Sequence, residues 1–140
     1  MKICAIILSA GKSKRFKSSI PKFMHNLSGL PIVDYNINLL KKIKKITKFE
    51  IISNKENLNY FQDKGYSPFK QNPVDGTGGA VRQFYKKNNK YDYYLVMLAD
   101  TPVFDYKVIS NFLNKAVKTN SDISVLSQNI SNPKGYGRLI

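Results

Sequence analysis

The stretch Ile6-Ile7-Leu8-Ser9-Ala10-Gly11-Lys12-Ser13-Lys14-Arg15, followed by Pro21-Lys22, decides the fold of this chain. Residues 2–8 form a nearly continuous apolar run, which is typical of a strand buried on both faces of a parallel sheet. The strand leads into a loop, residues 9–22, that contains one glycine, several cations and no acid. Gly11 lets a ligand approach the backbone closely, and the cations suit phosphate groups. The stretch predicts a phosphate-binding loop, and a solvated basic loop stays open as the alternative.

The rest of the chain continues this alternation of strands and helices. The pattern predicts further strands at 49–53, 66–71, 93–99 and 123–127, and helices at 31–45, 56–64, 79–87 and 105–118. Such alternation predicts an α/β fold, a Rossmann-like and mostly parallel sheet flanked by helices, in one domain over residues 1–140. Ligands of such sheets bind beyond the carboxyl ends of the strands. The loop matches neither G-x-x-x-x-G-K-[ST] nor G-x-G-x-x-G, which excludes the P-loop and dinucleotide-binding motifs.

Composition indicates the compartment in which the protein acts and which classes of partner it does not bind. The chain has one cysteine, Cys4, which excludes an internal disulfide and fits the reducing cytoplasm. No apolar run approaches the ~18 residues that a membrane-spanning helix needs, so we expect no membrane partner. The formal net charge is +14, with 20 lysines against three arginines. Because readers of phosphates and bases favour arginine and these lysines are spread along the chain, we expect no nucleic-acid partner, with a basic nucleic-acid-binding domain as the less favoured alternative.

Two further loops carry residues suited to a nucleotide and a metal. Gln71 offers an amide donor and acceptor, which suits the edge of a nucleobase. It precedes a glycine-rich loop in which Gly76 permits close backbone approach and Thr77 is expected to cap the next helix. Asp100 follows the strand at 93–99, where a lone carboxylate suits Mg²⁺ together with substrate phosphates. A plain turn with a helix cap, and a turn aspartate before Pro102, remain the respective alternatives.

Together these elements resemble the uridyltransferase domain of the bacterial N-acetylglucosamine-1-phosphate uridyltransferases, in the sugar nucleotidyltransferase superfamily. That family opens with Leu-Ala-Ala-Gly-Lys-Gly-Thr-Arg-Met and Leu-Pro-Lys, which residues 8–16 and 20–22 follow. Its Gln and its Leu-Gly-Thr-Gly-His-Ala correspond to Gln71 and residues 75–80, and its Tyr-Gly-Asp corresponds to residues 98–100. Its Gly-Tyr-Gly-Arg is matched outright by residues 135–138. The chain departs from the family at Ser13-Lys14, at Gly79 and at Leu98-Ala99.

The resemblance implies a reaction and a role for each matching residue. UMP would pass from UTP to N-acetylglucosamine 1-phosphate, a hexosamine 1-phosphate, giving UDP-N-acetylglucosamine and pyrophosphate with Mg²⁺ as cofactor. The implied nucleotide contacts are Leu8, Ser9, Ala10, Gly11, Lys22, Gln71, Gly76, Thr77, Leu98, Ala99 and Asp100. Among all matching residues, Arg15 and Lys22 would be catalytic, Asp100 would hold the metal, and Gly137 would contact the sugar's acyl group.

The family continues beyond its Gly-Tyr-Gly-Arg motif. The continuation brings further sugar contacts, a second metal ligand and a β-helix acetyltransferase domain, none of which occurs in residues 1–140. We therefore expect a fragment or a short relative whose C-terminal part is missing. A nucleotide-binding module without turnover stays open as an alternative. So does a related transferase with another nucleotide or sugar phosphate, such as the molybdenum-cofactor guanylyltransferases. The sequence leaves the oligomeric state open.

Overall fold

The structure is a computed structural model, and it describes residues 1–11, 16–103, 105–132, 134, 135 and 137. The chain divides into two compact units, Met1–Tyr106 and Lys107–Ile140. The first unit contains a four-stranded parallel sheet in the order β5-β4-β1-β6. Its strands are β1 (Ile3–Leu8), β4 (Ile46–Ser53), β5 (Phe69–Lys70) and β6 (Tyr93–Leu98). The predicted fold class, a mostly parallel sheet flanked by helices, is confirmed.

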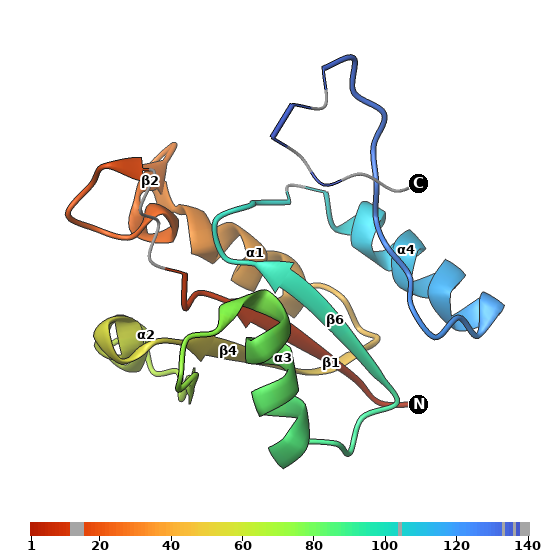
Figure 1. Cartoon of the computed structure of the whole chain (residues 1–140). Helices are drawn as coiled ribbons and strands as arrows, with labels where there is room; N and C mark the ends of the chain where they lie inside the picture. Colours follow the sequence, from red (N-terminus) through yellow and green to blue (C-terminus); the bar gives the residue numbers. More distant parts are fainter. Residues whose placement is uncertain (12–15, 104, 133, 136, 138–140) are drawn as a thin grey trace. The chain divides into compact units, whose positions relative to one another are not determined.

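Strand β1 lies in the interior of the sheet, between β4 and β6 (Figure 1). All six of its residues are buried, as its continuous apolar run predicts. At its carboxyl end Leu8 pairs with Ile52 on one side and Leu98 on the other. The three strands therefore end level with one another, and the loops that follow them share one edge of the sheet.

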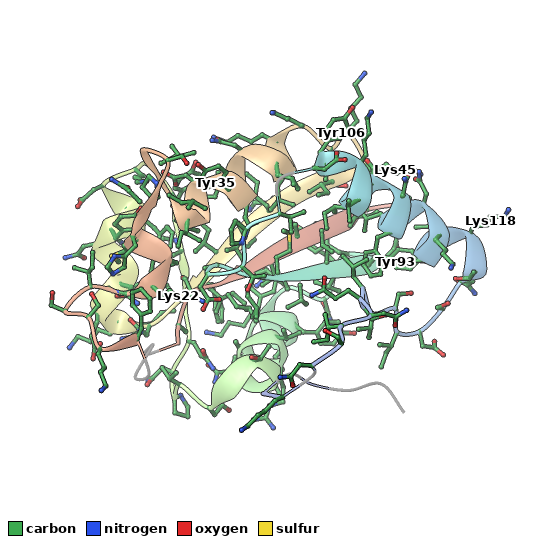
Figure 2. The ribbon with its side chains drawn as sticks, turned by 90° about the horizontal axis from the view of Figure 1, so that it is seen from above. Lys22, Tyr35, Lys45, Tyr93, Tyr106 and Lys118 are labelled. Atoms are coloured by element: carbon green, nitrogen blue, oxygen red, sulfur yellow. The ribbon has the colours of Figure 1, made fainter. Side chains whose placement is uncertain are left out.

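Two helices cover the two faces of this sheet. Alternate residues of β1, including Ile6, pack with Ala80 and Phe84 of α3 (Gly76–Lys87). The intervening residues of β1 point to the other face, because strand side chains alternate. Figure 2 shows α1 (Ile32–Lys41) and α3 on opposite sides of the strands. Among the described residues, no helix has both the length and the apolar character needed to cross a bilayer.

The other elements of the first unit are short: η2 (Lys22–Met24), β2 (Asn26–Leu27), β3 (Leu30–Pro31), η3 (Lys55–Asn57) and α2 (Leu58–Gln62). The longer helix α4 (Tyr106–Thr119) begins at the last residue of the first unit and belongs otherwise to the second. The β2–β3 hairpin was not predicted from the sequence. Its turn residues Ser28 and Gly29 both have positive φ, at 50° and 83°, as a tight two-residue hairpin turn requires.

The predicted strand at 123–127 is wrong. The segment adopts no regular secondary structure, and Ile123, Val125 and Leu126 are exposed. An apolar segment becomes a strand only where a neighbouring strand pairs with its backbone, and propensity alone supplies no partner. The predicted helix 31–45 ends earlier, at Lys41. The N–H of Lys42 donates to the carbonyl of Leu39, three residues back, so the last turn is tighter than an α-helical turn. The predicted helix 79–87 begins earlier, at Gly76.

Candidate functional site

The residues that follow the strands form a row along the carboxyl edge of the sheet. The backbone N–H groups of Ser9 and Gln71 donate to carbonyls of β4, each at 2.8 Å. The N–H of Ala99 donates to the carbonyl of Leu8 at 3.0 Å. These bonds continue the ladders past the ends of β1, β5 and β6. The structure therefore brings the three predicted loops together at one edge, as ligand sites in parallel sheets require.

Gln71 and Asp100 stand at opposite ends of this row. Gln71 follows β5 and Asp100 follows β6, the two outer strands of the sheet. Three strand spacings of about 4.8 Å separate them, roughly 14 Å in all. The loop after β1, with Ser9, Ala10 and Gly11, lies between. The edge therefore suits an extended ligand that reaches from Gln71 to Asp100.

The predicted phosphate-binding lysine and metal-binding aspartate meet at the β6 end of the row. The Lys22 Nζ lies 3.6 Å from the Asp100 Oδ2. Their side chains are 41% and 38% exposed, so both remain accessible to a ligand. Pro21 leads into η2 and places Lys22 beside the ends of the strands, where Figure 2 labels it. A cation and a carboxylate from distant parts of the chain thus face the same space.

The Asp100 carboxylate is of the kind that binds Mg²⁺ as one ligand among several. Within the described ranges, no three or more His, Cys, Asp or Glu side chains gather into a cluster that could hold a metal alone. Mg²⁺ is commonly bound through one or two carboxylates together with substrate phosphates and water. The Asp100 carboxylate supplies one hard oxygen ligand at the loop edge. The Lys22 ammonium beside it can neutralise phosphate charge at the same place.

Two buried asparagines fix the backbone of the loop after β1. The Asn54 Nδ2 donates to the carbonyl of Ala10 at 2.9 Å, and the Asn57 Nδ2 donates to that of Ser9 at 3.3 Å. The Asn54 Oδ1 accepts from the backbone N–H of Asn57 at 2.9 Å, which ties the Asn54 side chain to the backbone that carries Asn57. Sequence reasoning missed this pair. Its signal is two asparagines directly after a buried strand, at the edge where ligands bind.

A third buried asparagine fixes the loop that carries Asp100. Asn36 lies on α1 and is fully buried. Its Nδ2 donates to the carbonyls of Leu98 at 2.9 Å and Thr101 at 3.1 Å, and its Oδ1 accepts from the Val103 N–H at 3.1 Å. Sequence reasoning missed Asn36 as well. Its signal is a polar residue on the apolar face of a predicted helix.

At the other end of the row, Gln71 is tied to the glycine-rich loop. Its side chain is buried, and its Nε2 donates to the Asp75 Oδ1 at 2.9 Å and to the Gly76 carbonyl at 3.1 Å. Gly76 has φ +92°, a conformation that favours glycine. The expected capping role of Thr77 is wrong, because α3 begins at Gly76 with Asp75 as its N-cap residue, and Thr77 already lies in the first turn.

Several predicted site residues stay predictions. Arg15, with Lys12 and Lys14, lies outside the described residues. Gly137 is described and exposed, and it belongs to the second compact unit. Leu98, the last residue of β6, and Ala99 directly precede Asp100, and the Ala99 N–H donates to the Leu8 carbonyl of β1. Their implied contacts with a nucleotide remain expectations.

The fold has counterparts among solved nucleotidyltransferases. The structure of CMP:2-keto-3-deoxy-manno-octonic acid synthetase complexed with CTP aligns with a TM-score of 0.67 at 15% identity, over 86% of this chain and 49% of that one. A putative glucose-1-phosphate thymidylyltransferase from Bacillus anthracis aligns with a TM-score of 0.65 at 20% identity, over 83% and 50% of the two chains. At these identities the likeness shows the fold alone.

Closer sequence relatives carry the name bifunctional protein GlmU. The protein of Buchnera aphidicola subsp. Schizaphis graminum is 34% identical over 139 residues, which cover 98% of this chain. That of Wigglesworthia glossinidia brevipalpis is 37% identical over 151 residues, which cover 96% of this chain. The chain spans about 30% of the length of these curated relatives. The similarity expected from the nucleotide-binding motifs is thus confirmed. The model of one family, the MobA-like NTP transferase domain, matches residues 5–137, and the chain belongs to that family.

Proposed function

We propose that the chain binds UTP along the carboxyl edge of its sheet and transfers UMP to N-acetylglucosamine 1-phosphate. The products would be UDP-N-acetylglucosamine and pyrophosphate. The observation that carries the proposal is the placement of Lys22 and Asp100 within 3.6 Å of each other, in the same row of loops as Gln71. The similarity to the GlmU proteins supports the choice of substrates. These substrates and the single buried cysteine suit a cytoplasmic protein.

The chemistry needs no nucleophile from the protein. An oxygen of the sugar phosphate attacks the α-phosphorus of UTP, and the bond from that phosphorus to the oxygen bridging the β-phosphate breaks. The bridging oxygen leaves with pyrophosphate and carries the electron pair of the broken bond. Lys22 neutralises charge on the phosphates, and the backbone that Asn54 and Asn57 hold orients the nucleotide. Asp100 would hold Mg²⁺, which when bound would neutralise further phosphate charge.

The remaining roles belong to the proposal by resemblance. Arg15 joins Lys22 in holding the phosphates, Gln71 with Gly76 and Thr77 contacts uracil, and Gly137 contacts the acyl group of the sugar. In this arrangement the base lies at the β5 end of the row and the phosphates at the β6 end, about 14 Å away, which matches the extended shape of a nucleotide.

Calorimetry and a turnover assay test the proposal. The full chain is titrated with UTP, GTP and CTP in the presence of Mg²⁺, and pyrophosphate release is then measured with N-acetylglucosamine 1-phosphate. Selective binding of UTP with pyrophosphate release is the expected result. Binding without release would support a nucleotide-binding module in place of an enzyme. Selective binding and turnover of another nucleotide would identify a related transferase, and indifference to all three nucleotides would contradict the proposal.

Substitution of the metal-binding residue gives a sharper test. Asp100→Asn removes the carboxylate charge from a partly exposed side chain, so we expect an unchanged melting temperature. Turnover should fall about 100-fold or more, as after loss of one charge-stabilising group at an active site. Mg²⁺ should no longer strengthen UTP binding. Asp63→Asn, at an exposed position after α2, is the matched control. Wild-type Mg²⁺ dependence in Asp100→Asn would remove Asp100 from the site.

A further inference from the structure

The carboxylate of Asp75 occupies the space above Gly79. A Cβ on Gly79 would lie 1.8 Å from the Asp75 Oδ1, so no larger residue fits there while Asp75 keeps its place. The same Oδ1 accepts from the Nε2 of Gln71 at 2.9 Å and from the Nε2 of Gln83 at 3.1 Å. The Oδ2 accepts from the Arg82 Nη2 at 3.1 Å. Three donors therefore hold the carboxylate in one position.

Asp75 and Gly79 depart together from the family motif. The resemblance places leucine and histidine at these two positions, within Leu-Gly-Thr-Gly-His-Ala, and here both differ. The Asp75 carboxylate fills the space that a Cβ at position 79 would need, so this aspartate and this glycine fit together. A feature of this chain's own sequence thus lies directly beside Gln71.

The Asp75 carboxylate fixes the orientation of the Gln71 amide. The Gln71 Nε2 carries two hydrogens, and two acceptors lie within reach: the Asp75 Oδ1 at 2.9 Å and the Gly76 carbonyl at 3.1 Å. A flipped amide would point its oxygen at both acceptors, which is repulsive. Oε1 is therefore the atom of the Gln71 amide that remains to take part in base recognition, and a carbonyl oxygen can only accept.

The surrounding loop reinforces this arrangement. The Gln83 Nε2 also donates to the Pro73 carbonyl at 2.8 Å, and its Oε1 accepts from the Asn72 N–H at 2.9 Å. Through Gln83, helix α3 thus holds the backbone of the segment that leads to Asp75. The hydrogen bond from Gln71, with Arg82 in addition, lowers the pKa of Asp75 below its usual value. Asp75 therefore stays an acceptor-only carboxylate at neutral pH.

We propose that Asp75 is a positioning residue that leaves Gln71 to face the base as an acceptor, so that the site favours oxo-bases with a ring N–H over cytosine and adenine. The proposal rests on the proposed function, which places the base at Gln71. Uracil donates from N3–H and guanine from N1–H, whereas cytosine N3 and adenine N1 are themselves acceptors. At the ring nitrogen of cytosine or adenine, an acceptor would face an acceptor, which leaves both without a hydrogen bond and disfavours binding. The exocyclic amino groups of these two bases meet the Gln71 oxygen only if the base shifts from the position that uracil takes.

The test compares nucleotide selectivity in the full chain with and without the carboxylate. Wild type, Asp75→Leu and Asp75→Asn are titrated with UTP, CTP and inorganic triphosphate in Mg²⁺. In Asp75→Leu the Gln71 amide is held by the Gly76 carbonyl alone, and we expect the preference for UTP over CTP to fall about 10-fold or more, the weight of one good base contact. Affinity for inorganic triphosphate should stay unchanged. Asp75→Asn keeps an acceptor oxygen and should retain the preference.

A second pair of variants isolates the contact with Gly79. Gly79→Ala should displace Asp75 and reduce selectivity as Asp75→Leu does. In the Asp75→Leu background the same alanine should have no further effect, because contacting residues are non-additive. Asp63→Leu, which alters an exposed acid elsewhere, is the matched control. Thermal melting identifies any variant that is unfolded.

The outcomes separate this inference from the proposed function. If wild type prefers UTP and Asp75→Leu keeps the full preference, the inference is overturned and the proposed function stands. Equal binding of CTP and UTP by wild type also overturns the inference. Loss of triphosphate affinity together with selectivity in folded Asp75→Leu would show a general structural role and overturn it too. A wild-type chain that binds no nucleoside triphosphate overturns both.

Discussion

Buried amide side chains hold the backbone at every loop of the candidate site. Asn54 and Asn57 bond the carbonyls after β1, Asn36 bonds the loop after β6, and Gln71 bonds the loop before α3. Backbone groups lose their ladder partners where strands end, and buried ones need replacements. An amide donates and accepts from one side chain, so it can satisfy a carbonyl and an N–H of the same loop.

Asn36 offers the clearest test of this arrangement. Asn36→Ala would leave the carbonyls of Leu98 and Thr101 and the N–H of Val103 without this partner. Because unsatisfied buried polar groups are costly, the free energy of unfolding should fall by about 2–3 kcal/mol. Mg²⁺-dependent nucleotide binding should weaken as well, since this loop carries Asp100. Urea denaturation and calorimetry measure the two effects.

The same helix supplies the control for this prediction. Asn38 lies on α1 two residues further along and is exposed. Asn38→Ala changes the same side chain on the same helix and should leave unfolding within about 0.5 kcal/mol of wild type. Equal stability of the Asn36→Ala and Asn38→Ala variants would show that the Asn36 bonds contribute nothing to the fold.

Cys4 tests the burial of β1. Burial, with a smaller contribution from the nearby Glu50 charge, raises the pKa of this thiol to about 11. The thiolate is the reactive form, so at pH 8 the native thiol should resist a disulfide reagent such as Ellman's reagent. Labelling should become immediate in urea. Ser67→Cys, at an exposed position, should react at once in the folded protein. Native Cys4 that reacts as fast as Cys at position 67 would contradict the burial of β1.

At the scale of elements, continuous apolar runs could be predicted and paired or turn-dependent elements could not. Residues 2–8 and 93–99 predicted β1 and β6 within a residue or two, because both runs are strongly apolar. β1 is buried throughout, as such a run predicts, whereas β6 lies at the edge of the sheet and leaves Val96 and Leu98 exposed. The β2–β3 hairpin has two residues in each strand and no apolar alternation to mark it. The segment 123–127 has the composition of a strand, but composition does not supply a pairing partner.

The residues of the candidate site also fall into those that could be predicted from the sequence and those that could not. Lys22 and Asp100 were predicted because each stands in a motif, Pro21-Lys22 and Leu98-Ala99-Asp100, that resembles the family's. Their 3.6 Å approach also depends on Pro21 and η2, which place Lys22 beside the strand ends and were not predicted. Asn36 and Asn54 were missed, because an asparagine carries no signal until the topology shows which carbonyl it faces. The close approach of the Asp75 carboxylate to Gly79 could likewise not be predicted from the sequence, because it depends on the backbone geometry at the start of α3.

At the scale of the whole molecule, charge is the dominant feature. The chain has 23 lysines and arginines against nine acids, so most cations have no acid to pair with. The described ion pairs, such as Lys64 with Asp34, are at the surface or half-buried. Excess charge of one sign destabilises a compact state by self-repulsion, and it attracts a polyanionic substrate. Both effects are screened by salt, because the Debye length falls from about 30 Å at 10 mM to under 10 Å above 0.15 M.

Salt should therefore act in opposite directions on stability and on binding. Between about 10 mM and 300 mM NaCl we expect the melting temperature to rise by about 3 °C, the shift that a change near 1 kcal/mol produces in a chain of this size. UTP affinity should fall over the same range. Replacing the exposed Lys42, Lys44 and Lys45 with glutamine lowers the formal net charge of +14 by three and leaves the proposed site intact. This variant should show a smaller rise in melting temperature. A melting temperature that falls with salt, or an undiminished rise in the variant, would show that self-repulsion does not limit the stability of this fold.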